Sequence, residues 1–160
     1  MSPHTVEVHI EEPYRAHRQA RLEVLRRAAE STLRQQDVAE ACELTVMLAG
    51  DETLRELNRR HRGVEAPTDV LAFPNVVKGP FVEPPGLQRY LGDVIVSFPR
   101  AMAQAAEAGH ELLAELQLLV VHGILHLLGY DDQTGPERAR MWRAQQAVLD
   151  DLGVDVHLPD

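Results

Sequence analysis

The segment ELLAELQLLVVHGILHLLGYDD, residues 111–132, predicts an apolar helix that carries a metal site. His122 and His126 are four residues apart, so both imidazoles project from one helix face and can reach the same ion. Gly129 is expected to end the helix and to turn the chain back, which would bring Asp132 to a third corner. Two nitrogen ligands and one oxygen ligand leave a position open for water, as in a catalytic zinc site.

A histidine pair at this spacing also occurs in ordinary helices, where it has only a structural role. Here both imidazoles belong to a helix rich in leucine and valine, where burial requires polar partners. A site that has lost its metal is the alternative interpretation, and His110 and Asp131 are reserve ligands. The protease pattern H-E-x-x-H places a glutamate base where this chain has Gly123. A glycine allows close packing but takes no proton, so the helix is zincin-like without the protease base.

Composition limits the class of protein. The 160 residues suffice for one domain, 1–160, and 44% of them are hydrophobic. A net charge of −9 argues against broad nonspecific binding to nucleic acid, although a local basic groove remains compatible with it. Cys42 is the only cysteine, which excludes an internal disulfide and fits a reducing compartment. With no signal peptide and no long apolar run, we expect a cytoplasmic protein without a membrane partner.

The spacing of apolar residues predicts four strands and five helices. The predicted strands are Val6–Ile10, Leu44–Leu48, Thr68–Phe73 and Leu91–Ser97. The predicted helices cover about residues 15–35, a short stretch capped by Asp51, residues 99–109, residues 111–128, and a stretch from the capping box Thr134–Glu137 to Leu152. The proline-rich residues 74–90 are expected to form a surface loop. This order predicts an α+β (mixed α/β) fold, with a single small mixed sheet of about four strands packed by about five helices.

Three motifs resemble the YbeY family of bacterial endoribonucleases and rRNA maturation factors. Residues 122–132 are similar to its pattern H-G-x-L-H-L-x-G-Y-D-H. Residues 57–62 with residues 67–74 are similar to a second motif, and Leu91–Ile95 matches a third. The resemblance implies a zinc-dependent, single-strand-specific endoribonuclease. It would act in small-subunit (16S) rRNA 3′-end maturation and ribosome quality control, with RNA and the small ribosomal subunit as partners and no DNA.

By the same resemblance, His122 and His126 are ligands of one Zn²⁺ ion per chain. Asp132 stands where the family has its third histidine. A carboxylate ligates zinc at about 2.0–2.2 Å, so Asp132 remains our expected third ligand. It lowers the net charge of the site from +2 to +1, which should make the bound water less acidic and make Mn²⁺ or Mg²⁺ more acceptable.

Arg62 falls on the family's functionally important arginine, and we expect it to act in catalysis. It ends a stretch with Arg55, Arg59 and Arg60, for which a solvated helix end is the ordinary interpretation. The resemblance reverses that preference for Arg62 alone, which would stabilise charge on a phosphate attacked by water or by the ribose 2′-OH.

Other residues of the motifs are expected to be structural. Asn58, Asp69 and Asp93 belong to this group, and Asp69 and Asp93 are candidates for a hydrogen bond to a ligand histidine. Met141 and Trp142 are core candidates. Two further functions stay open: a zincin-like metallohydrolase acting on peptides, and a non-catalytic ribosome-associated factor with a structural metal.

Overall fold

The computed structural model describes residues 3–66, 68–75 and 89–156. Most of the predicted loop, residues 76–88, therefore lies outside the described residues. The elements, in chain order, are β1 (Thr5–Ile10), a 3-10 turn η1 (Glu12–Tyr14), α1 (Leu22–Gln35), β2 (Cys42–Ala49), α2 (Asp51–Arg62), β3 (Val70–Pro74), β4 (Arg89–Ser97), α3 (Phe98–Ala108), α4 (Leu112–Leu127) and α5 (Gly135–Leu152).

The four strands form one mixed sheet in the order β1-β2-β4-β3. Strand β2 pairs in parallel with both β1 and β4, whereas β3 is antiparallel to β4 at the edge. Alternate residues of β2 are buried, because one set of side chains faces the helices. The predicted α+β fold, with its mixed sheet and five helices, is confirmed.

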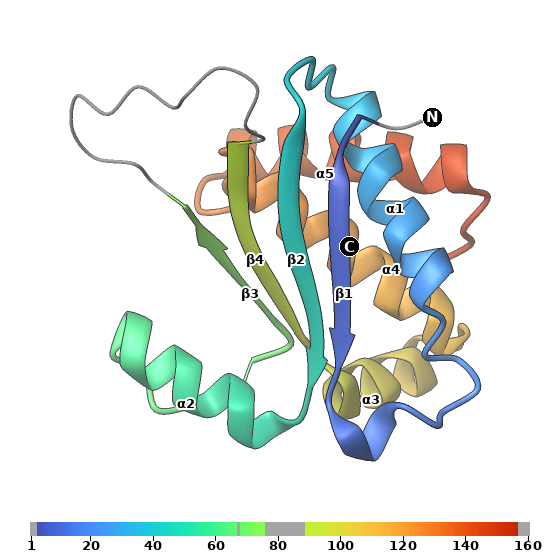
Figure 1. The fold of residues 1–160 in the computed structure, drawn as a ribbon, viewed down its shortest axis with the longest axis vertical. Helices are drawn as coiled ribbons and strands as arrows, with labels where there is room; N and C mark the ends of the chain where they lie inside the picture. Colours follow the sequence, from blue (N-terminus) through green and yellow to red (C-terminus); the bar gives the residue numbers. More distant parts are fainter. Residues whose placement is uncertain (1–2, 67, 76–88, 157–160) are drawn as a thin grey trace.

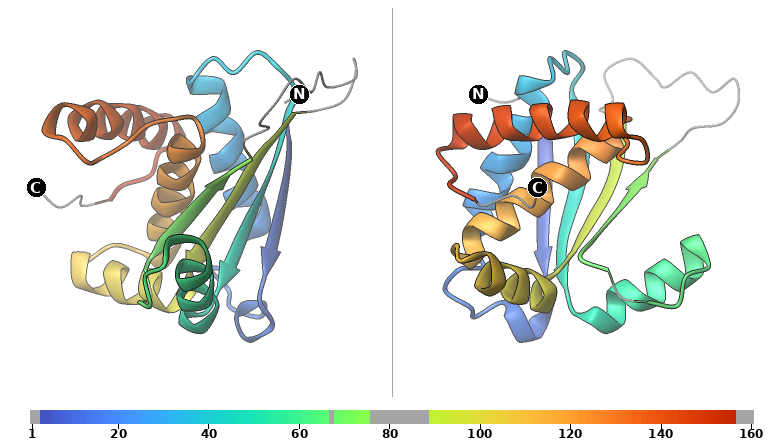
Figure 2. Two further views of the ribbon diagram at one scale, coloured as in Figure 1. Left: turned by 90° about the vertical axis from the view of Figure 1, so that its left-hand side faces the viewer. Right: turned by 180° about the vertical axis from the view of Figure 1, so that it is seen from behind.

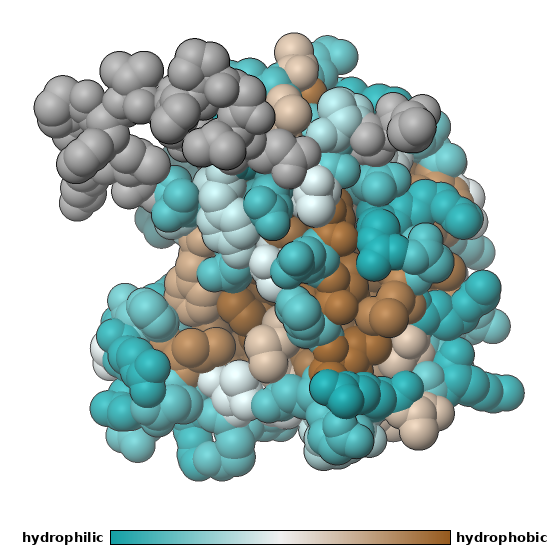
Figure 3. All heavy atoms as spheres, viewed as in Figure 1, coloured by the Kyte–Doolittle hydropathy of each residue, from teal (hydrophilic) through white to brown (hydrophobic). Residues whose placement is uncertain are grey.

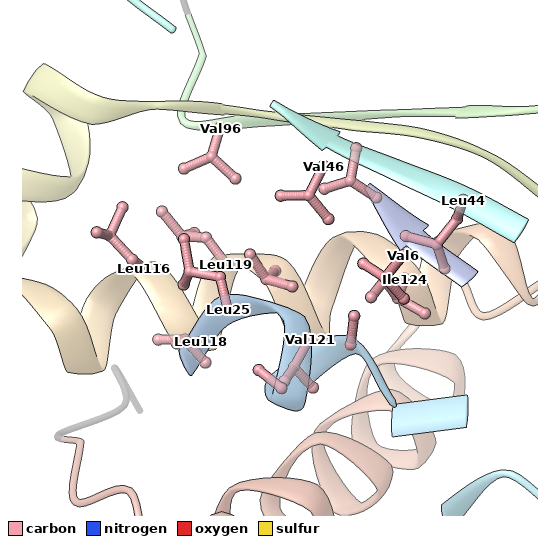
Figure 4. Packing of buried hydrophobic residues seen from close by; sticks show 14 of the residues in the cluster. Val6, Leu25, Leu44, Val46, Val96, Leu116, Leu118, Leu119, Val121 and Ile124 are labelled. Atoms are coloured by element: carbon pink, nitrogen blue, oxygen red, sulfur yellow. The ribbon is translucent and has the colours of Figure 1, made fainter. Parts of the chain in front are cut away.

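Helices α1 and α4 cover one face of the sheet, and α5 packs on the outside of these two helices (Figures 1 and 2). Helix α4 is apolar around most of its circumference because it contacts α1, α3, α5, β3 and β4. Figure 4 shows Leu119 and Ile124 of α4 packed among Leu25 of α1 and Val46 and Val96 of the sheet. Because core residues surround α4, the backbone that carries the two histidines near its C-terminal end is held in place by packing.

The opposite face of the sheet carries a smaller cluster, seen in Figure 3 between the strands and α2. Its buried members are Ala49, Leu54, Leu71 and Ile95. Leu54 comes from α2, so this cluster fixes α2 beside the edge strand β3. The C-terminal end of α2, with Arg62, is thereby held near the start of β3.

Two local predictions are wrong. The first helix begins at Leu22 rather than near residue 15, because Tyr14 stacks on Phe98 with ring centroids 4.7 Å apart and holds the preceding chain in a 3-10 turn. Asp51 is the first residue of α2 and not its cap, because its carboxylate accepts a hydrogen bond from the Ser97 hydroxyl at 2.7 Å. The predicted cap at Thr134 is confirmed by its bond from the Glu137 N–H.

Among the described residues, no single helix has both the length and the hydropathy to cross a bilayer. The pair α3 and α4, bent by 116°, meets the criterion only when the two lengths are joined.

Candidate metal centre

Two imidazoles from one face of α4 meet at the centre of the site. The Nε2 atoms of His122 and His126 lie 3.2 Å apart, and the ring centroids are separated by 4.7 Å. One α-helical turn separates the residues, so the spacing follows directly from the sequence. Both side chains are partly buried, which leaves the converging nitrogens open to a ligand.

The turn after α4 returns the chain toward these imidazoles. Gly129 adopts a φ of 101°, which an L side chain rarely tolerates. The N–H of Tyr130 donates to the carbonyl of Leu125 at 3.0 Å, which closes the helix end. As a result, a carboxylate oxygen of Asp132 lies 4.0 Å from the Nε2 atom of His126.

The hydrogen bonds of the two Nδ1 atoms determine which nitrogen of each imidazole carries the proton. His122 Nδ1 lies 3.0 Å from Oε1 of Gln145, and His126 Nδ1 lies 3.0 Å from the carbonyl of Tyr130. Each oxygen accepts, so each Nδ1 donates a proton and each Nε2 presents a lone pair. Two lone pairs and a carboxylate converge, and such an arrangement favours a cation between them.

The three groups fit a metal ion by chemistry and by spacing. One ligand atom from each of His122, His126 and Asp132 lies within 4.8 Å of the other two. Two nitrogens bound tetrahedrally to one zinc are roughly 3.3 Å apart, close to the observed separation of the Nε2 atoms. The reserve ligands are engaged elsewhere: His110 contacts Glu115, and Asp131 accepts from the N–H of Asp132.

Burial lowers the pKa of His122 below its ordinary value, and the neighbouring His126 lowers it further. The hydrogen bond to Gln145 and the charges of Asp132 and Asp69 act in the opposite direction. Because burial dominates, His122 is neutral at physiological pH, the state in which an imidazole binds a metal.

Gly123 lets α4 approach the sheet closely. A Cβ at this position would lie 2.5 Å from a methyl of Val94 and 3.3 Å from a methyl of Val70. Val94 is fully buried and β-branched, so it has little freedom to move away. The position therefore has no room for the glutamate base of a zinc protease.

A cavity of about 540 Å³ brings the three groups together with Arg62 and the start of β3. Arg62 is exposed, and it makes no hydrogen bond or ion pair with any described residue. Arg55 pairs with Glu52, whereas Arg59 and Arg60 share Glu56. Within the described part of the chain, Arg62 is thus the arginine of α2 that is free to bind an anion in this cavity.

The remaining motif residues have identifiable contacts. Asn58 donates from its side chain to the carbonyl of Ala66 at 2.8 Å, which ties the chain after Arg62 back to α2. Asp69 accepts from the Gln104 amide at 3.3 Å and faces His122 without bonding it. Asp93 accepts a hydrogen bond from the Tyr90 hydroxyl and does not line the cavity that contains Arg62 and the three metal-binding groups, which we call the metal cavity.

Gln145, which is 97% buried and bonds His122, is a residue of the site that is not among those predicted from the sequence. A signal was present, because Gln145 interrupts the apolar stripe that Met141, Val148 and Leu149 form on α5. Met141 is a core residue as predicted, whereas Trp142 is only partly buried at the edge of the core.

A mixed sheet backed by an apolar helix with two histidines and a nearby carboxylate defines the class as an α+β protein with a zincin-like helix. The chain belongs to the YbeY family, since the family model for endoribonuclease YbeY matches residues 7–153. The family resemblance of the three motifs is therefore confirmed.

Relatives cover nearly the whole chain. A protein from Roseiflexus castenholzii named Endoribonuclease YbeY is 47% identical over 82% of this chain and 83% of its own length. One of the same name from Roseiflexus sp. is 43% identical over 96% of both chains. The solution structure of TM1509 from Thermotoga maritima matches with a TM-score of 0.60 and 25% identity, over 92% of this chain and 89% of that one.

Proposed function

We propose that this chain is a metal-dependent endoribonuclease that cleaves single-stranded RNA, and that residues 1–160 form one catalytic domain. The observation that carries the proposal is that one cavity contains a three-residue metal-binding group together with Arg62, which pairs with no residue that the structure describes. The relatives named Endoribonuclease YbeY support RNA as the substrate class.

His122, His126 and Asp132 would hold one divalent ion. Such an ion acts as a Lewis acid that polarises a phosphoryl oxygen and activates the attacking group. Two imidazoles and a carboxylate suit Zn²⁺, and the carboxylate also tolerates Mn²⁺ or Mg²⁺. Gln145 and the carbonyl of Tyr130 hold the two rings in the tautomer that binds the ion.

Arg62 would bind a nonbridging oxygen of the scissile phosphate. Its guanidinium is permanently charged and forms paired hydrogen bonds to phosphate oxygens. It would stabilise the negative charge that develops while water or the ribose 2′-OH attacks. Peptide hydrolysis is less well supported, because Gly123 leaves no room for the protease base.

The cellular substrate we propose is the precursor of 16S rRNA at its 3′ end, reached in the cytoplasm on the small ribosomal subunit. The motifs shared with the YbeY family support this assignment. Mapping of 16S rRNA 3′ ends in cells that lack the protein tests it, and normal ends would contradict it.

A cleavage assay tests the proposed activity. Purified protein is incubated with single-stranded RNA, with duplex RNA of the same sequence and with casein, each with and without a chelator. We expect cleavage of single-stranded RNA that stops with chelator, returns with added Zn²⁺ and is absent in His126→Ala. RNA cleavage that survives both treatments, cleavage of casein alone, or no cleavage with a metal-dependent melting temperature would each contradict the proposal.

A further inference from the structure

A second cavity, also of about 540 Å³, adjoins the metal cavity along α4. We call it the side cavity. It shares Asp69 and His122 with the metal cavity, and its other walls come from α3, α4, α5 and the turn between α3 and α4. A molecule in the side cavity would therefore lie directly beside a proposed metal ligand.

The walls of the side cavity combine a flat apolar surface with amide groups. Leu118, Leu119 and the partly buried Trp142 supply the apolar part. Gln145 lines the cavity, and its amide nitrogen donates to no described residue. The amide oxygen of Gln104 is also without a described partner.

The charges of the two cavities differ. Among the described residues that line the side cavity there is no lysine or arginine, whereas Asp69, Glu107 and Glu115 are present. The metal cavity contains Arg62. An anionic phosphate therefore suits the metal cavity, and a neutral, flat group suits the side cavity.

We propose that the side cavity binds one nucleobase of the RNA substrate, from a nucleotide next to the cleaved bond; this rests on the proposed endoribonuclease function. Its volume falls within the range of small-molecule sites. Single-stranded RNA is recognised through unstacked bases that lie against aromatic side chains and form hydrogen bonds at their edges. Trp142 would stack on the base, and Gln104 and Gln145 would contact its edge.

The hydrogen-bonding groups of the side cavity favour a base with an amino group. Acceptors predominate, since Asp69, Glu107 and the amide oxygen of Gln104 all accept. Adenine and cytosine present exocyclic amino donors, and uracil presents carbonyl oxygens there. We therefore expect adenine and cytosine to bind more tightly than uracil.

Trp142 is the only tryptophan of the chain, so its fluorescence reports on the side cavity directly. The test titrates the metal-loaded protein with adenosine, cytidine, uridine and ribose. We expect saturable quenching by adenosine and cytidine, weaker quenching by uridine and none by ribose. Equal responses to ribose and to the nucleosides, or no saturable response, would overturn the proposal.

Variants of α3 localise the binding. Ala108→Phe places a large ring at the wall of the side cavity and should abolish the quenching, whereas Ala106→Phe, on the exposed side of the same helix, should leave it unchanged. Gln104→Leu removes an acceptor and should reduce the preference for adenosine and cytidine over uridine. Quenching in Ala108→Phe equal to that of the unchanged protein would place the nucleoside elsewhere and refute the proposal.

The same samples separate this proposal from the nuclease proposal. If the protein cleaves single-stranded RNA but nucleosides do not quench Trp142, the nuclease proposal stands and the base-site proposal is refuted. If nucleosides and variants give the expected quenching but RNA is not cleaved, the base-site proposal stands and the nuclease proposal is refuted. Oligouridylate with one internal cytidine or abasic position adds a kinetic readout, because cleavage should concentrate beside cytidine and not beside the abasic position.

Discussion

The Nε2 atoms of His122 and His126 lie 3.2 Å apart, and the oxygens that face each Nδ1 place the proton of each neutral ring away from this contact. Each ring donates its Nδ1 proton to an oxygen, one on Gln145 and one on the backbone of Tyr130. Two lone pairs held this close repel each other unless a cation binds between them. The positions of the two rings therefore match those that a bound metal ion requires.

Gln145 positions His122, which gives a prediction on metal affinity. Gln145→Leu removes the acceptor of the Nδ1 proton and should weaken metal binding by about 10–100-fold. Gln145→Glu keeps an acceptor and should restore most of the affinity. Gln146→Leu, the exposed neighbour on α5, is the control. Competition with a chromophoric chelator measures the affinities, and equal values for Gln145→Leu and the unchanged protein would contradict the role.

Gly123 sets the distance between α4 and the sheet, so a larger residue should destabilise the fold. Gly123→Ala brings a methyl against Val94 and should cost about 1–3 kcal/mol of unfolding free energy. Helix propensity alone predicts the opposite effect, a stabilisation of about 1 kcal/mol, because alanine is the better helix former.

Urea unfolding measures this effect. Gly135→Ala, whose methyl would meet nothing within 4 Å, is the matched control and should be neutral or stabilising. The double variant with Val94→Ala should show less than the sum of the two single losses, because the smaller side chain removes the contact. A stabilised Gly123→Ala protein would show that the close approach has no energetic importance.

Arg62 should affect cleavage without affecting the metal. Arg62→Ala is expected to lower kcat by about 10²–10³-fold, as expected for loss of one charge-stabilising donor. Arg60→Ala removes a cation that already pairs with Glu56 and should change kcat little. Single-turnover cleavage and metal content are measured on the same preparations. A loss of metal in Arg62→Ala, or an equal loss of rate in Arg60→Ala, would refute the assignment.

Asp151 joins α5 to α1, and its pKa gives the pH dependence of stability. Hydrogen bonds from Ser31 at 2.9 Å and Arg34 at 3.0 Å lower the pKa of Asp151. The stabilisation is fully present above the unfolded carboxyl pKa of about 3.9 and is lost as the pH falls through the lower folded value. Asp151→Asn should unfold at lower urea concentration at neutral pH, and the difference should shrink below about pH 4. A difference that persists in acid would contradict this interpretation.

The features predicted from the sequence are those set by local spacing. The order of strands and helices follows from apolar periodicity, and the His122–His126 pair is visible because both residues lie on one helix turn. The turn at Gly129 was predicted for the same reason. These features depend on neighbours within a few residues, which a single sequence displays.

The features that escaped prediction depend on contacts between distant segments. The start of α1 is set by the stacking of Tyr14 on Phe98, and the role of Asp51 is set by Ser97. Gln145 reaches His122 only because α5 packs on α4. The side cavity forms where α3, α4 and α5 meet, so no single stretch of sequence shows it.

The most direct test of the metal centre is an anomalous difference map from crystals of the zinc-loaded protein. We predict one peak per chain, bonded to Nε2 of His122, Nε2 of His126 and a carboxylate oxygen of Asp132 at about 2.0–2.2 Å. A peak that lacks Asp132 as a ligand, or one that lies away from the two histidines, would contradict the proposed site.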